Sequence, residues 1–291
     1  KYFKNKGYTI FTFNRNTNKR NEGYSSENII GVNELKEIII DLDIIIHLSS
    51  KAHSNKFSLQ NQKENYFITK SLIEFAKKIR LKKFIFLSSI NVNGDYSDTN
   101  IISEKSIPNP LSLYAKSKFE LEQLIQNEFK NSFIEYYNIR IPLVIGENAK
   151  GNLKSLMYLA KFNVPLPIKG INNKRSFISI IDIIRIFENI IELKSNKSGL
   201  YLAANDQSLS LYSLYNYINS SFRNNNNTFY LNKNLLKLIF LIIGKKNSFI
   251  KIFNSFEIDN SKLCKELDFN SFSDITKEIN KMVKSFKNKD E

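Results

Sequence analysis

The sequence contains very little cysteine, histidine or tryptophan. Its 291 residues include one cysteine, two histidines and no tryptophan. A single cysteine excludes an internal disulfide and any metal site built from several cysteines, and two histidines are too few for a histidine-rich zinc site. We therefore expect no metal centre. The lack of paired cysteines is typical of a reducing compartment, so we expect a cytoplasmic protein.

Long apolar runs are also missing. No stretch reaches the ~20 apolar residues that a membrane-spanning helix needs. The longest apolar run, residues 235–243, is interrupted by Lys237 and followed by Gly244. Core packing is the expected role of this segment, and a basic amphipathic contact with a membrane surface is the alternative. No signal peptide is recognised in residues 1–7, which resemble the end of a helix stopped by a glycine.

Acidic residues are outnumbered by basic ones. The chain has 43 Lys and Arg against 28 Asp and Glu, which gives a formal charge of +15. A basic surface can bind nucleic acid or anionic membranes. The lysines, however, are scattered over the whole chain without a dense block. Compositional bias explains the charge, and we expect no nucleic-acid partner.

Strand-like and helix-like segments alternate in the first half of the chain. Alternation of this kind predicts an α/β fold with a doubly wound parallel sheet. The pattern loosens after residue 150, which favours a Rossmann-type domain over 1–165 and a smaller α/β substrate lobe over 166–291. The expected strands are 8–13, 43–48, 84–87, one within 135–145, 177–181 and 200–203. The expected helices are 64–79, 113–129, 211–222, 234–243 and 273–286.

Tyr114 and Lys118 are the first candidates for chemistry. They are four residues apart, so they share one face of the expected helix. A lysine ammonium beside a phenol lowers the tyrosine pKa and makes it a usable acid or base near neutral pH. With 14 tyrosines and many lysines in the chain, this spacing alone also fits a solvated helix face.

The surroundings of this pair carry a resemblance to a known family. A strand that ends in Ser88 and Ser89 precedes the helix, and Ser89 lies 25 positions before Tyr114. This arrangement resembles the extended short-chain dehydrogenase/reductases, which include the NAD-dependent nucleotide-sugar epimerases. The resemblance implies that Ser89, Tyr114 and Lys118 form a catalytic group.

Further motifs resemble the same family in the same order: residues 47–50, 65–69, 140–146, 151–153 and 175–178. They imply sites for NAD or NADP and for a diphosphate-linked sugar, and the resemblance also implies a homodimer. Asn14 and Arg15 follow an expected strand, where an acidic residue would favour NAD and an arginine NADP. The expected cofactor-binding residues are Asn14, Arg15, Leu48, Ser49, Ser50, Asn65, Ser88, Tyr114, Lys118 and Pro142. The expected substrate-binding residues are His53, Ser89, Asn91, Asn152 and Arg175.

Two features depart from the family pattern. The glycine-rich loop that seats the cofactor pyrophosphate is absent, and we expect it upstream of Lys1 in an incomplete chain, or lost in a protein that no longer binds the cofactor. Asn93 replaces a tyrosine found in many members. The surrounding segment resembles bacterial surface-polysaccharide enzymes that act at C4 of N-acetylhexosamines carried on UDP or undecaprenyl diphosphate.

Three functions therefore stay open at this point. The first is an NAD(P)-dependent 4-epimerase of such a sugar. The second is a reductase of UDP-4-keto-6-deoxy-GlcNAc, which would use the same residues. The third, from another class, is a non-catalytic regulator that binds NAD(P) or a sugar.

Overall fold

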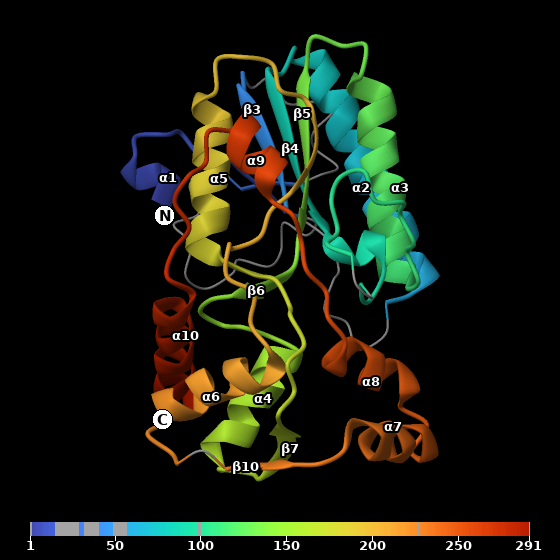
Figure 1. Ribbon diagram of the computed structural model, residues 1–291. Coiled ribbons are helices and arrows are strands. Elements are labelled where there is room, and N and C mark those ends of the chain that lie inside the picture. The colour runs from blue at the N-terminus through green and yellow to red at the C-terminus, as the bar shows by residue number, and fades with distance from the viewer. Residues whose placement is uncertain are drawn as a thin grey trace.

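A four-stranded parallel sheet organises the upper lobe of the molecule (Figure 1). In the computed structural model the described residues are 2–14, 29–31, 41–48, 57–97, 100–225 and 227–290. The strand order is β3 (Ile44–His47), β4 (Lys83–Ser89), β5 (Glu135–Ile141) and β9 (Gly199–Leu202). All three neighbouring pairs are parallel, and the expected α/β fold is confirmed.

Helices cover both faces of this sheet. On one face, α2 (Leu59–Lys78) and α3 (Leu113–Phe129) share an apolar core with β3 and β4. On the other face, α5 (Ile180–Glu192) and α9 (Ser261–Glu266) pack against β5 and β9 (Figure 1). Because the sheet is buried on both sides, β4 is continuously apolar from Phe84 to Leu87, between Lys83 and its two terminal serines.

Pro142 lies inside residues 135–145, the segment in which the sequence predicted a strand. It follows β5 and precedes β6 (Leu143–Ile145), which pairs in parallel with β8 (Phe177–Ser179) instead of joining the main sheet. Proline has no backbone N–H and cannot donate to a central ladder. The chain therefore leaves the sheet lobe directly after the end of β5.

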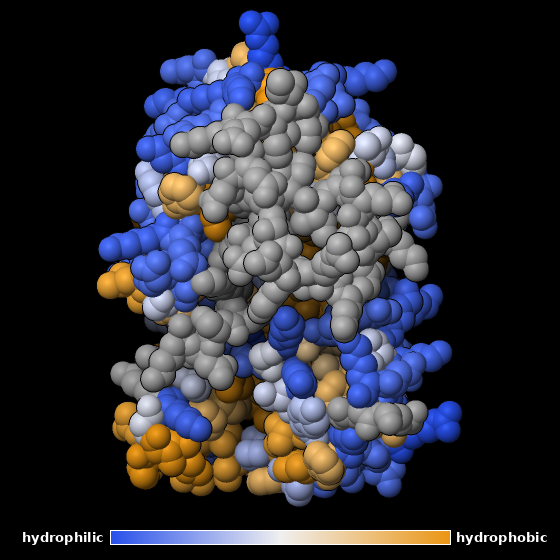
Figure 2. Space-filling model, turned by 180° about the vertical axis from the view of Figure 1, so that it is seen from behind, coloured by the Kyte–Doolittle hydropathy of each residue, from blue (hydrophilic) through white to orange (hydrophobic). Residues whose placement is uncertain are grey.

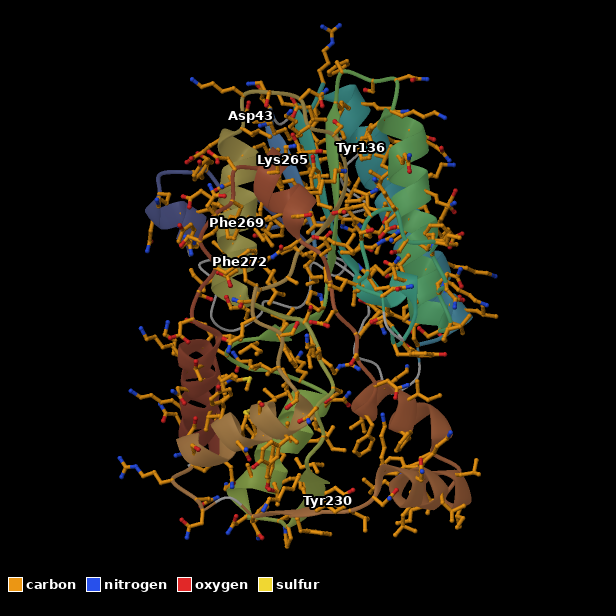
Figure 3. The ribbon with its side chains drawn as sticks, in the orientation of Figure 1. Asp43, Tyr136, Tyr230, Lys265, Phe269 and Phe272 are labelled. Atoms are coloured by element: carbon orange, nitrogen blue, oxygen red, sulfur yellow. The ribbon has the colours of Figure 1, made fainter. Side chains whose placement is uncertain are left out.

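The lower lobe is built around its own apolar core. Its main helices are α4 (Asn152–Lys161), α6 (Leu211–Ser221) and α10 (Ile275–Asp290). It also contains β7 (Leu166–Lys169), β10 (Thr228–Tyr230), α7 (Lys233–Ile242) and α8 (Lys246–Phe253). Figure 3 shows Asp43 and Tyr136 near the top of the sheet lobe and Tyr230 at the opposite end of the molecule.

The chain returns to the sheet lobe after it has entered the lower one. Helix α5, strand β9 and helix α9 all follow residue 165 and all pack on the sheet. This differs from the predicted division into 1–165 and 166–291, because two later segments complete the sheet lobe. Sequence periodicity shows where elements form but not which sheet a short late strand joins.

The first elements of the chain pack against the sheet lobe, where the Tyr2 hydroxyl donates to Glu188 of α5 and Phe13 contacts Phe75 of α2. Helix α1 (Tyr2–Asn5) is followed by β1 (Thr12–Asn14), which pairs in parallel with β2 (Ile29–Gly31). Strand β1 is shorter than the expected 8–13. Within the residues that the structure describes, no helix is both long and apolar enough to cross a bilayer.

Candidate active site

Ser89 marks the end of the central strand. It closes β4 opposite Ile141, the last residue of β5, so the two neighbouring strands end at the same level. The short 3-10 helix η2 (Ile90–Asn93) starts directly afterwards, and the Asn91 amide donates to the Ser89 hydroxyl at 3.3 Å. The strand end and the following turn thus fix the position of Ser89.

Tyr114 and Lys118 lie in the first two turns of α3. The helix begins where the Ala115 amide donates to the Ser112 hydroxyl at 3.1 Å. One turn on, the Lys118 ammonium donates to the Leu87 carbonyl of β4 at 2.7 Å and lies 4.6 Å from the centroid of the Phe86 ring. Lys118 is therefore held against the strand that carries Ser89.

The pKa of Tyr114 differs from the sequence expectation. Burial raises the pKa of this phenol above its ordinary value, and a side-chain hydrogen bond with Ser89 acts in the opposite direction. The sequence predicted a lowered pKa caused by Lys118. That prediction was wrong for this structure because desolvation of the buried phenol is the dominant effect.

A cavity of about 650 Å³ joins these residues to the lower lobe. Ser89, Tyr114 and Lys118 line one part of it, and Asn152 and Arg175 line another. The structure therefore brings together predicted residues that lie far apart in the sequence. The cavity is also lined by four other residues that the sequence predicted to bind cofactor or substrate: Leu48, Ser88, Asn91 and Pro142.

Some expected residues are placed elsewhere. Asn65 is buried in α2, and its carbonyl accepts a hydrogen bond from Thr69, whose hydroxyl is 2.9 Å from Nε2 of His47. It is not among the residues that line the cavity. Asn14 is the last residue of β1, and the structure describes its backbone but not its side chain. Arg15, Ser49, Ser50 and His53 lie outside the described residues.

Arg175 occupies the part of the cavity in the lower lobe. Its backbone bridges to Leu209 and Phe256, and its guanidinium donates to the Asn254 carbonyl at 3.0 Å. Burial lowers the pKa of Arg175, which Asp95 partly offsets. The guanidinium nevertheless stays charged, because the ordinary arginine pKa lies above 12.

Sequence reasoning gave no role to four charged residues on the cavity wall, namely Asp95, Glu147, Lys150 and Lys251. Lys251 of α8 forms an ion pair with Asp95 at 3.2 Å, and Lys150 lies just before the start of α4. The position of Lys150 beside the Gly151-Asn152 motif could have indicated it. Nothing in the sequence connects Asp95 with Lys251, because their contact depends on how the two lobes meet.

Gly146 shows how closely the backbone is packed at this wall. A Cβ atom added there would lie 2.4 Å from Cδ1 and 3.2 Å from Cβ of Ile180. Both residues line the cavity. Only glycine allows the strand end to approach the start of α5 this closely.

A buried polar network supports the site from behind. Arg140 of β5 donates to the Glu122 carboxylate of α3 with contacts as short as 2.6 Å, and to the Asn93 side-chain oxygen at 2.8 Å. The Ser88 hydroxyl also donates to Glu122. Asn93, which departs from the family pattern, therefore joins η2 to β5.

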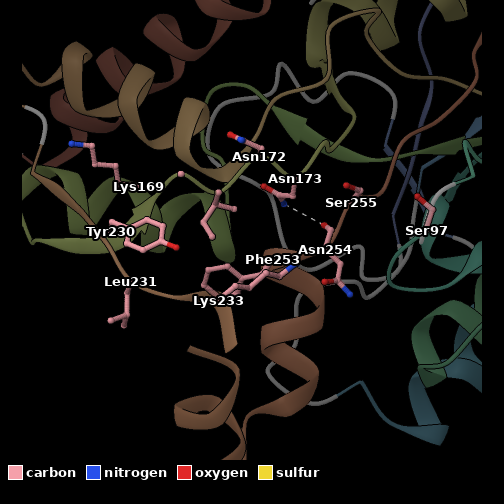
Figure 4. A pocket seen from close by; sticks show the side chains of 12 residues that line it. Ser97, Lys169, Asn172, Asn173, Tyr230, Leu231, Lys233, Phe253, Asn254 and Ser255 are labelled. Atoms are coloured by element: carbon pink, nitrogen blue, oxygen red, sulfur yellow. Dashed lines mark hydrogen bonds between the residues drawn. The ribbon is translucent and has the colours of Figure 1, made fainter. Parts of the chain in front are cut away.

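A second cavity of about 490 Å³ lies in the lower lobe (Figure 4). Asn173 donates to the Asn254 carbonyl at 3.2 Å, the bond drawn as a dashed line. The same carbonyl accepts from Arg175 of the first cavity. Asn254 thus links the two cavities. The other lining residues are Ser97 and residues 169–172, 230, 231, 233, 253 and 255.

A family model described as the NAD dependent epimerase/dehydratase family matches residues 1–203. The chain belongs to this family. It is 29% identical over 175 residues to a UDP-glucose 4-epimerase of Vibrio cholerae, a match that covers 57% of this chain and 53% of the relative. The chain spans about half the length of the curated relatives it matches.

Solved structures of epimerases share the fold. A UDP-glucose 4-epimerase of Thermotoga maritima superposes with a TM-score of 0.78 at 16% identity, covering 100% of this chain and 94% of the other. A UDP-N-acetylglucosamine 4-epimerase of Bacillus cereus gives 0.74 at 19% identity, covering 97% and 91%. The predicted membership of this NAD-dependent enzyme family is confirmed.

Proposed function

We propose that this chain is an NAD(P)-dependent 4-epimerase of a nucleotide-linked sugar, with UDP-linked N-acetylhexosamine as the expected substrate class. One observation carries the proposal. A single cavity connects an acid/base group, formed by Ser89, Tyr114 and Lys118, with the cationic residue Arg175 in the other lobe. A sugar diphosphate needs both features, one at its carbon 4 and one at its phosphates.

The residues around the acid/base group fit a nicotinamide cofactor. The Lys118 ammonium would bond the nicotinamide ribose, and Leu48 and Pro142 offer apolar contacts for the ring. When bound, NAD or NADP supplies the acceptor and donor of a hydride at the sugar carbon. The protein's own part is to position the sugar and to move its proton.

Tyr114 is the proposed base for the sugar hydroxyl. Because burial raises its pKa, the phenolate has to be stabilised by nearby positive charge, and Lys118, one turn along the same face of α3, is the candidate. Ser89 is hydrogen-bonded to Tyr114 and would also contact the C4 oxygen. The proton of the C4 hydroxyl would pass to Tyr114 and return from it.

Arg175 and the start of α4 would hold the diphosphate. A guanidinium matches phosphate oxygens in geometry and charge. Asn152 begins α4, where the free N–H groups of a helix favour an anion, and Lys150 adds positive charge. The second cavity adjoins Arg175 through Asn254 and leaves room for the nucleoside.

A direct assay tests this function. The protein is incubated with UDP-GlcNAc or UDP-GalNAc and NAD, without added reductant, and interconversion is measured. We expect conversion that Tyr114→Phe reduces by about 100-fold or more, the usual size of an acid/base contribution. Oxidation of NADPH with UDP-4-keto-6-deoxy-GlcNAc, without interconversion, would instead identify a reductase. An undecaprenyl-diphosphate-linked sugar is the third substrate to test.

The assay also separates an enzyme from a non-catalytic regulator. Lys116→Gln changes an exposed lysine on the same helix as Tyr114, and we expect it to leave the rate unchanged. A protein that binds both NAD and UDP-sugar but converts none of these substrates would contradict the proposal.

A further inference from the structure

Helix α7 has two apolar stripes instead of one. Leu236 is buried, and Phe240 packs 5.7 Å from the rings of both Phe249 and Phe253, which anchors the helix to the lower lobe. The second stripe follows the i, i+3, i+4, i+7 pattern of one helix face and points away from this core. Its members are Leu235, Leu238, Ile239 and Ile242, and their exposed fractions are 46%, 51%, 40% and 76%.

The exposed stripe is part of a larger apolar patch. Ile243, directly after α7, is also largely exposed. Figure 2 shows hydrophobic residues gathered at the lower left of the rear view, at the end of the molecule where Figure 1 places α7. Contiguous apolar patches of this kind usually mark an interaction surface.

The charge around the patch is of one sign. Residues 207–256 contain no aspartate or glutamate, although they form the whole of α6, α7 and α8. Lys233 and Lys237 lie on α7 and Lys245 follows it, and all three are exposed. An apolar helix face flanked by lysines is suited to a layer that is apolar inside and negative at its surface.

We propose that α7 docks in the plane of an anionic lipid bilayer, with its outer stripe inserted at the boundary of headgroups and acyl chains. With ten residues the helix is too short to span a bilayer. In a symmetric contact between two copies, Lys233 and Lys237 of one copy would lie near the same lysines of the other and repel them. Anionic headgroups would instead neutralise these charges. This inference does not rest on the proposed catalytic activity.

Docking would orient the second cavity toward the lipid surface. Tyr230, Leu231 and Lys233, which lead into α7, line that cavity, and Phe253 of α8 lines it too (Figure 4). The surface that we propose to contact lipid is therefore continuous with a wall of the candidate substrate site. An enzyme held in this way would take its substrate close to the membrane plane.

Co-sedimentation with vesicles tests the proposal. The whole chain is mixed with vesicles of equal parts phosphatidylglycerol and phosphatidylcholine, and with vesicles of phosphatidylcholine alone. We expect strong binding to the first and weak binding to the second. The double variant Leu238→Glu with Ile242→Glu should reduce the partition coefficient by about 100-fold or more, since two apolar side chains lose their burial. Lys233→Gln with Lys237→Gln should reduce it about 30-fold.

Matched controls separate the stripe from general surface effects. Phe133→Glu replaces an aromatic residue that is 66% exposed in the sheet lobe, and Lys63→Gln with Lys70→Gln removes two exposed lysines of α2. These variants should bind vesicles like the unchanged protein. Because the changed α7 side chains are exposed, circular dichroism should show an unaltered fold.

Three results would overturn the proposal. They are absence of binding to the anionic vesicles, equal binding to both vesicle types, and undiminished binding by the Leu238→Glu, Ile242→Glu variant. Self-association that this variant abolishes, without vesicle binding, would identify the patch as an interface between copies. Epimerase activity is measured separately, so a failed lipid test leaves the proposed function standing.

Discussion

At the scale of single residues, the protonation of Tyr114 is the main question. The phenol must accept a proton, yet it is partly buried, and its desolvation favours the neutral form. Ser89 is the group within the site that counteracts this effect by hydrogen bonding. The spacing of Tyr114 and Lys118 predicted both residues, but the degree of burial cannot be read from spacing, so the direction of the pKa shift could not be predicted.

Removal of the Ser89 hydroxyl should raise the pKa of Tyr114 further. Because the pKa already lies above the ordinary 10.0, the phenolate fraction rises with pH through the neutral range and beyond. Tyrosinate absorbance, taken as the difference between each protein and its Tyr114→Phe counterpart, reports this titration without any substrate. We expect a midpoint above 10 for the unchanged chain and a higher one for Ser89→Ala.

The rate should follow the same order. Epimerisation should increase with pH, and this rise in rate should move to higher pH in Ser89→Ala. Ser155→Ala, at an exposed position of α4, serves as the control and should leave both curves in place. An unchanged or lowered midpoint in Ser89→Ala would show that the hydrogen bond has no influence on Tyr114.

At the scale of elements, the contact between α3 and β5 decides whether the site keeps its shape. Glu122 lies one turn beyond Lys118 on α3, and it pairs with Arg140, whose side chain is 2% exposed. Removal of one partner of a buried ion pair leaves the other charge without compensation. The network therefore couples the catalytic helix to the central sheet.

Glu122→Ala should lower the free energy of unfolding by about 3–5 kcal/mol, because the buried Arg140 guanidinium is left without its carboxylate. The matched control is Glu128→Ala on the same helix. Glu128 pairs with Lys77, but both side chains are more than a third exposed, so we expect a loss of about 1 kcal/mol or less. Urea unfolding measures both variants, and equal losses would contradict this account.

Helix α5 shows what element prediction from this sequence could not resolve. Residues 177–181 were expected to be a strand, yet only Phe177–Ser179 forms β8 and the helix starts at Ile180. Isoleucines dominate α5, and β-branched residues favour strands. The decisive local signal is Ser179, whose hydroxyl accepts from the Asp182 amide at 3.0 Å and caps the helix. By contrast, α3 was predicted with its observed bounds, because its apolar residues follow the helical period.

At the scale of the whole molecule, the candidate site depends on how the two lobes meet. The sequence motifs predicted Ser89 and Arg175 as members of one site, and the cavity that contains both was expected only through the resemblance. No sequence pattern indicates the ion pair between Lys251 and Asp95 on the wall of this cavity. Sequence reasoning thus predicted the site residues that belong to a motif on one element. It could not predict contacts between two distant segments that together form one wall of the cavity.

The two-lobe arrangement predicts that a nucleotide alone stabilises the protein. UDP should raise the Tm, since a ligand present at 100 times its Kd adds about 2.7 kcal/mol to the free energy of unfolding.

Arg175→Ala should weaken UDP binding about tenfold or more, because charge-assisted hydrogen bonds to the phosphates are lost. The control is Lys174→Ala, which removes the charge next to Arg175 in the sequence; its side chain is 70% exposed, and the change should leave the shift unchanged. Tyr114→Phe should also keep the full shift, because the phenol lies at the sugar end of the cavity. A UDP shift equal in Arg175→Ala and the unchanged chain, measured by thermal denaturation at several UDP concentrations, would place the diphosphate somewhere other than beside Arg175.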